Sequence, residues 1–147
     1  MEKQIKSRKR VKEFAEVFTS EREVKAMCDL LPDEIWNNIE STFLEPACGN
    51  GNFLVEIFSR KLERCNSEKE GLKALASIVG VDIQNDNVEE SRKRLRELYL
   101  KRFPSANAFC LVLLAQILHN NIFCDDSLKR MQSWIDETKP TQLKLEI

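Results

Sequence analysis

The sequence predicts an α/β fold, a Rossmann-like three-layer sandwich with a short, mostly parallel sheet. Short apolar runs typical of buried strands alternate along the chain with longer segments whose apolar residues recur at helical spacing. Polar loops rich in glycine or acidic residues follow the strand-like runs directly, as they do where parallel strands end. The 147 residues are enough for one domain, so we expect residues 1–147 to form a single unit that begins with a basic arm, residues 1–15.

The first half of the chain contains one expected strand and three expected helices. Ser20 and Glu23 have the spacing of a capping box, and the helix that they open is stopped by Pro32. Residues 42–44 form a short buried strand that runs into a loop, residues 46–52. Apolar residues then recur at helical spacing over residues 53–62, and a second capping box, Ser67 with Glu70, opens the next helix.

The second half repeats this alternation. Residues 77–83 are an apolar strand that contains Asp82 near its end, and Asp86 with Glu89 forms a third capping box for a long helix. A further helix is expected from after Pro104 to about residue 118, followed by a strand over residues 122–124. From Ser127 a last helix runs to near Pro140, and the alternating residues 143–147 suit a half-exposed edge strand.

The composition is that of an ordinary folded domain with balanced charge. Hydrophobic residues make up 42% and charged residues 32%, and the formal net charge is -1. Because no overall positive field exists, nucleic acid is expected to bind only through a local patch or a partner. The most apolar run, residues 106–118, is too short to cross a bilayer, and the charged N-terminus lacks a secretory signal. We therefore expect a cytoplasmic protein without membrane contact.

The cysteines argue against a metal site. There are 5 cysteines, none in a C-x-x-C pair, and His119 is the single histidine. A structural zinc site needs four closely arranged ligands, usually as two local pairs. We therefore expect no metal, and reduced thiols that are mostly buried in the core.

Several polar features should meet at one edge of the sheet. The carboxyl ends of parallel strands share an edge, which brings Glu45, the glycine loop, Asp82 and Asp126 together. Gly49 and Gly51 let the backbone pass close to a ligand, and the following helix points free N–H groups at it. The third glycine of a dinucleotide fingerprint is absent, whereas Asp82 suits ribose hydroxyls. The pattern favours a nucleoside with a compact, partly anionic tail.

Residues 43–54, FLEPACGNGNFL, resemble D-P-A-C-G-S-G-N-F-L, the first motif of the adenine-specific DNA methyltransferases of restriction–modification systems. Residues 16–19, EVFT, resemble the E-V-F-T-P segment of that family, and residues 80–83, GVDI, resemble its second motif. Residues 121–128, NIFCDDSL, resemble its third motif, N-I-x-x-G-D-S-L. The four matches keep the family's order and span residues 16 to 128, most of the chain.

This resemblance implies that the chain binds S-adenosylmethionine. Phe18 and Thr19 would meet the methionine carboxylate end and Glu45 the amino group, while Asp82 would take the ribose hydroxyls. Ile83 would lie against the adenine face, and Asp126 would reach the adenine amino group. The implied cofactor-binding residues are Phe18, Thr19, Glu45, Pro46, Ala47, Gly49, Gly51, Asn52, Phe53, Asp82, Ile83 and Asp126.

The sequence also departs from the family pattern. Ser20 replaces the proline after Phe-Thr, and Asp125 stands where the third motif has glycine. The family's catalytic motif, N-P-P-Y, which holds the flipped adenine, is not in the sequence, so no catalytic residue is named. The fold is thus expected to be truncated relative to a full class I methyltransferase. A partner subunit or further sequence would supply the catalytic loop and target recognition, and DNA would bind only with their help.

Other interpretations remain open at this stage. The chain could be a non-catalytic module that binds S-adenosylmethionine or a partner methyltransferase, or a residual fold that has lost its ligand. The glycine loop could be a plain tight turn, and Asp82, Asp125 and Asp126 could simply cap turns or helices. The basic arm could be solvated, or it could contact a DNA backbone.

Overall fold

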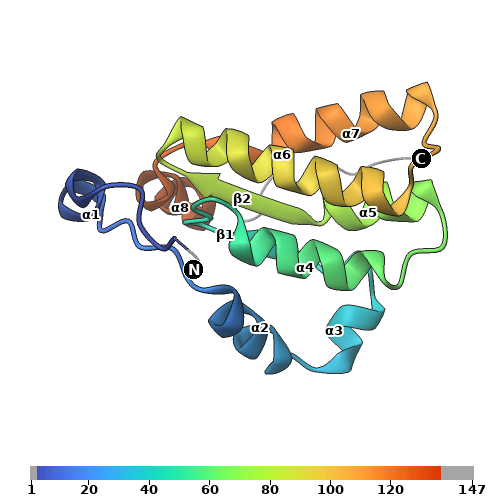
Figure 1. Cartoon of the computed structure of the whole chain (residues 1–147), viewed down its shortest axis with the longest axis horizontal. Coiled ribbons are helices and arrows are strands. Elements are labelled where there is room, and N and C mark those ends of the chain that lie inside the picture. The colour runs from blue at the N-terminus through green and yellow to red at the C-terminus, as the bar shows by residue number, and fades with distance from the viewer. Residues whose placement is uncertain (1–2, 137–147) are drawn as a thin grey trace.

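The computed structural model describes residues 3–136 of the chain (Figure 1). Helices alternate with short strands, as the sequence predicts, but the helices over residues 8–14 and 33–37 were not predicted. In chain order the elements are α1 (Arg8–Phe14), α2 (Glu21–Asp29), α3 (Asp33–Asn37), β1 (Phe43–Glu45), α4 (Asn52–Leu62), α5 (Glu68–Ala76), β2 (Ile78–Asp82), α6 (Asn85–Arg102), α7 (Ala108–Asn121), β3 (Ile122–Cys124) and α8 (Ser127–Asp136).

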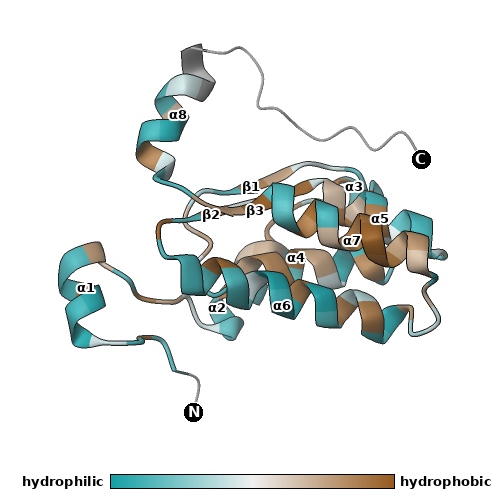
Figure 2. Cartoon of the chain, turned by 90° about the horizontal axis from the view of Figure 1, so that it is seen from above, coloured by the Kyte–Doolittle hydropathy of each residue, from teal (hydrophilic) through white to brown (hydrophobic). Residues whose placement is uncertain are grey.

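The strands form a parallel sheet in the order β1-β2-β3, flanked by helices, which confirms the predicted fold class. Phe43 is in register with Ile78, and Gly80 with Ile122. Helix α4 packs against α6 and α5 against α7, and all four helices contact β2. Gly80 makes the close approach of α4 feasible, because a Cβ there would lie 2.7 Å from Leu54 Cδ1. Figure 2 shows the apolar colour concentrated on α4, α5 and α7, around this sheet.

Two of the three predicted capping boxes are confirmed, and the third is wrong. The Ser20 hydroxyl accepts a hydrogen bond from the Glu23 N–H, and the Ser67 hydroxyl accepts one from the Glu70 N–H at 3.2 Å. Helix α6, however, begins at Asn85, so Asp86 lies inside its first turn. The N-cap Gln84 makes no side-chain capping bond, and the Asp86 carboxylate accepts the N–H of its neighbour Asn87 at 2.9 Å. It receives charged partners from the N-terminal segment, which the local spacing does not encode.

A buried lysine ties the amino-terminal ends of β1 and β2 together. Lys61 has no exposed surface, and its ammonium group donates to the backbone oxygens of Ile39 and Ser41 and to the Ser77 hydroxyl. Burial lowers the pKa of Lys61 to about 8. These bonds hold the chain that enters β1 beside the turn that enters β2.

Some predictions fall on residues outside 3–136. The end of the last helix near Pro140 and the edge strand over residues 143–147 lie outside the described residues. Within them, four of the cysteines are buried and none forms a disulfide, which confirms the expected core thiols; Cys124 is exposed. Every helix of this part of the chain is too short or too polar to cross a bilayer.

Candidate functional site

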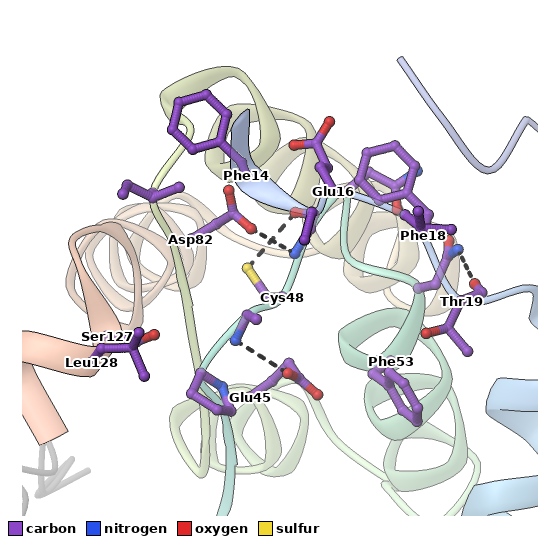
Figure 3. A pocket seen from close by; sticks show the side chains of 18 of the residues that line it. Phe14, Glu16, Phe18, Thr19, Glu45, Cys48, Phe53, Asp82, Ser127 and Leu128 are labelled. Carbon is purple, nitrogen blue, oxygen red and sulfur yellow. Dashed lines mark hydrogen bonds between the residues drawn. The ribbon is translucent and has the colours of Figure 1, made fainter. Parts of the chain in front are cut away.

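A cavity of about 530 Å³ opens beyond the carboxyl ends of β1 and β2 (Figure 3). Its walls are the N-terminal segment over residues 14–19, the loop between β1 and α4, the end of β2, and the turn that starts α8. In both cartoon views α1 and α8 lie at the same end of the molecule (Figures 1 and 2), and residues from both helices line the cavity. The volume is that of a typical small-molecule site.

Nearly all the residues implied to bind a cofactor line this cavity, and Gly51 is the one that does not. Gly51 is the N-cap of α4 with a φ of 94°. A Cβ there would lie 2.8 Å from Ser91 Oγ and 3.2 Å from Ser91 Cα. Gly51 therefore lets α6 pack closely against the start of α4, whereas the resemblance implied a cofactor-binding role for it.

Gly49 has a different role from that of Gly51. Its φ is 53°, and a Cβ on it would lie 2.9 Å from Phe18 Cδ1. The ring of Phe18, only 6% exposed, thus packs directly on the loop backbone. Because Gly49 has no Cβ, the N-terminal segment can pack through Phe18 against the loop that follows β1.

Asp82 organises the loop and the start of α6. Its Oδ2 accepts the Gly49 N–H at 3.0 Å, and its Oδ1 accepts the Gln84 N–H at 2.8 Å and the Asn87 side-chain amide at 3.1 Å. The structural interpretation of this acid, as a residue that caps a turn, is therefore correct. A carboxylate has about four acceptor positions, so Asp82 retains capacity for a ligand hydroxyl as well.

Glu45 is a partly buried carboxylate on the opposite side of the loop. It accepts the Ala47 N–H at 3.2 Å (Figure 3). Burial raises the pKa of Glu45, and the backbone hydrogen bond from Ala47 opposes that rise. Such a group gains from a cationic ligand partner, because a nearby positive charge offsets the cost of burying the ionised form.

Asn52 and Arg94 fix the N-terminal segment against the loop. The Asn52 amide donates to the Thr19 carbonyl oxygen at 2.7 Å. Arg94 donates to the Asn50 carbonyl oxygen and to Asn52 Oδ1, both at 2.8 Å. No local pattern marked Arg94 in advance, since a charged residue on a long helix is typical of a solvated face.

Two aspartates precede α8, and one of them caps that helix. Asp126 Oδ1 accepts the Leu128 N–H at 3.1 Å, and Asp125 pairs with Arg130 at 2.7 Å. Among the described residues, Ala15 is the only non-glycine with positive φ, so Asp125 occupies the glycine position of the third motif without backbone strain. The helix-capping interpretation is thus correct for Asp126, whereas Asp125 accepts the Asp126 N–H at 2.8 Å, and both residues line the cavity.

The cavity has an apolar rim that the sequence reasoning did not anticipate. Phe14 and Met131 are 45% and 39% exposed, and Leu128 is 81% exposed. Together with Ile83, which is half exposed, they offer contact area for a flat ring. Helical spacing alone could not place Leu128 and Met131 at a cavity, because it does not say what α8 packs against.

The cavity offers no cysteine nucleophile and no cluster of metal ligands. Burial raises the pKa of Cys48 to about 12, so the thiol stays protonated near neutral pH. Within residues 3–136, no group of three or more His, Cys, Asp and Glu side chains is arranged to hold a metal ion. The polar groups in the cavity are thus suited to binding a ligand by hydrogen bonds and charge.

Comparison with known proteins links the chain to a methyltransferase. It is 39% identical over 83 residues to the Type II methyltransferase M.VspI of Vibrio sp. (strain 343). The match covers 56% of this chain and 17% of that enzyme. No family model matches the chain, and no solved structure matches it. The resemblance to methyltransferases is therefore one of family level, over part of the chain.

Proposed function

We propose that this chain binds S-adenosylmethionine and forms the cofactor-binding half of an adenine-specific DNA methyltransferase. The observation that carries the proposal is the meeting of Glu45, the Gly49 loop and Asp82 at one cavity of suitable volume. Partial identity to a Type II methyltransferase supports the same ligand. The carboxylates provide acceptors for the amino and hydroxyl groups of this cofactor, and the apolar rim suits its adenine ring.

Different residues of the cavity bind the methionine, ribose and adenine parts of the cofactor. Glu45 holds the methionine amino group, with the Phe18–Thr19 backbone near the carboxylate. Asp82 accepts a ribose hydroxyl, and because three donors already bind it, we expect one strong ligand bond there. Ile83 packs on the adenine ring, and Asp126 accepts a hydrogen bond from the adenine amino group.

When bound, S-adenosylmethionine supplies an electrophilic methyl group on a sulfonium sulfur. This chain's residues orient that group by binding the amino group, the ribose and the adenine ring. The target adenine needs a separate loop, since the N-P-P-Y motif is not in the sequence. We propose that a partner subunit or further sequence supplies this loop together with the DNA-reading surface.

The test is calorimetric titration with S-adenosylmethionine and S-adenosylhomocysteine. We expect micromolar affinity for the wild type, on the order of -7 to -8 kcal/mol. Asp82→Ala should weaken binding by roughly 1.5–3 kcal/mol, because it removes a charge-assisted hydrogen bond. Asp29→Ala is the matched control, since Asp29 is an exposed acid that pairs with Arg60 away from the cavity. Equal affinity of wild type and Asp82→Ala would show that the site is misplaced.

The second candidate is a non-catalytic module that binds the cofactor or a partner methyltransferase. The missing catalytic motif is the observation that favours it. Transfer of a labelled methyl group to adenine-containing DNA by the chain alone would exclude this module. Cofactor binding without transfer, followed by transfer once a partner is added, would support the split enzyme. Absence of binding to either ligand would exclude both the split enzyme and a cofactor sensor.

A further inference from the structure

Asn87 is a fully buried side chain that joins three partners at the edge of the cavity. Its Oδ1 accepts the Lys6 ammonium at 2.6 Å. Its Nδ2 donates to Glu16 Oε2 at 2.7 Å and to Asp82 Oδ1 at 3.1 Å. One amide nitrogen therefore bridges a carboxylate of the N-terminal segment and the carboxylate at the end of β2.

Apart from the buried ring of Phe18, the N-terminal segment, residues 3–19, is held mainly by polar contacts of this kind. Helix α1 has no buried residue. Arg10 pairs with Asp86 and with Glu16, both at 2.7 Å, and Lys6 pairs with Asp86 and Glu90. The hydrogen bonds of Arg10 hold the pKa of Asp86 well below its usual range. The segment nevertheless forms one wall of the cavity, from Phe14 to Thr19.

The Asn87 amide makes the two sides of the cavity interdependent. If the segment leaves, Asn87 loses Lys6 and Glu16 and keeps only its side-chain bond to Asp82. Once the segment has left, water replaces Lys6 and Glu16 around the amide, so the side chain is no longer held in one orientation and its bond to Asp82 Oδ1 weakens. Conversely, a ligand that fixes Asp82 favours the arrangement in which Asn87 also holds Glu16.

We propose that Asn87 is a positioning residue through which the N-terminal segment controls ribose recognition by Asp82. The proposal rests on the proposed function, because it takes Asp82 as the acceptor for a ribose hydroxyl. The segment closes over the cavity when a nucleoside with vicinal hydroxyls binds. Ligands that lack a hydroxyl bind with the segment less firmly held.

The test compares S-adenosylhomocysteine with its 2′-deoxy and 3′-deoxy analogues by calorimetry. The wild type should prefer the ribose form by about tenfold over at least one analogue, as expected for loss of a hydrogen bond to a charged group. In Asn87→Ala this preference should fall to about twofold. A purely structural role of Asn87 would weaken all ligands by the same factor and leave the preference unchanged, and that result would overturn the proposal.

A second variant acts from the segment side and leaves the fully buried Asn87 in place. Glu16→Ala removes the far partner of the Asn87 amide, and we expect the ribose preference to fall by about threefold. Glu13→Ala is the matched control, since Glu13 is an exposed glutamate of the same segment that lies 4.0 Å from Lys9. The same preference in both variants would contradict the coupling. If the wild type binds neither ligand, the proposed function fails; if it binds and the preference never changes, only the role of Asn87 fails.

Discussion

Substitution of Gly51 by alanine should destabilise the whole domain, whereas the same change at Gly49 should act mainly on the N-terminal segment. Gly51 has a φ of 94°, and its missing Cβ faces Ser91 of α6, including the backbone Cα at 3.2 Å. Backbone cannot rotate away as a side chain can. At Gly49 the obstacle is the Phe18 ring at 2.9 Å, which belongs to a segment that can move.

The magnitude follows from two costs and one gain. A non-glycine residue in the left-handed region costs about 1–2 kcal/mol, and forcing α4 and α6 apart costs about 1–3 kcal/mol. Alanine also narrows the unfolded ensemble, which returns about 0.4–1 kcal/mol. We therefore expect Gly51→Ala to lower the free energy of unfolding by about 2–4 kcal/mol, a large share of the stability of a small domain. Gly49→Ala should cost about 1 kcal/mol globally.

Urea unfolding followed by circular dichroism measures the global effect, and hydrogen exchange over residues 3–19 measures the local one. Gly49→Ala should raise exchange in that segment and shift the midpoint of unfolding by less than Gly51→Ala does. Gly51→Ala should shift the midpoint, and adding Ser91→Ala should recover only part of the loss, because that change removes the hydroxyl and leaves the β-carbon and backbone of residue 91 in the way. A loss below about 1 kcal/mol for Gly51→Ala, or equal losses at both glycines, would refute the reasoning.

Further predictions concern three polar groups. Burial lowers the pKa of Lys61 to about 8, so the folded chain binds fewer protons than the unfolded chain between pH 8 and the ordinary lysine value. The wild type should therefore gain about 2 kcal/mol of stability relative to Lys61→Met from pH 7.5 to pH 9.5, measured by urea unfolding; a constant difference would contradict this. Asp86→Asn should expose the N-terminal segment to limited proteolysis at pH 7. The wild type should show the same exposure only in acid, because its depressed pKa keeps the ion pair intact until the pH falls through it; equal resistance of both proteins would argue against ionic docking. Iodoacetamide at pH 8 should modify Cys124 well before Cys48, whose thiol is buried and has a pKa raised to about 12. Mass spectrometry of tryptic peptides measures the order of modification, and earlier modification of Cys48 would contradict the prediction.

Local patterns predicted most of the fold because they depend on neighbours in sequence. The parallel strands are apolar runs, and the helices after Ser20 and Ser67 are opened by side chains three residues apart. The same reasoning failed at Asp86, where the spacing to Glu89 imitates a capping box. The carboxylate instead binds Arg10 and Lys6, more than 70 residues earlier in the chain.

For the candidate site, the motifs predicted which residues gather but not how each one acts. The loop, Asp82 and the Phe18–Thr19 segment line one cavity, as the carboxyl ends of parallel strands suggested. Gly51 proved to serve helix packing, and Arg94 and Asn87 were not anticipated. Their positions on α6 are typical of a polar helix face, and nothing local distinguishes them.

Local sequence patterns thus specified the elements, their order and the set of polar groups at one edge of the sheet. The packing of distant segments settled which of these groups share a hydrogen-bond partner, and which glycine faces a helix instead of the cavity. This division arises because secondary structure follows from periodicity and capping within a few residues. The bonds of Asn87 to Lys6 and Glu16, in contrast, form only after packing has brought distant segments within bonding distance.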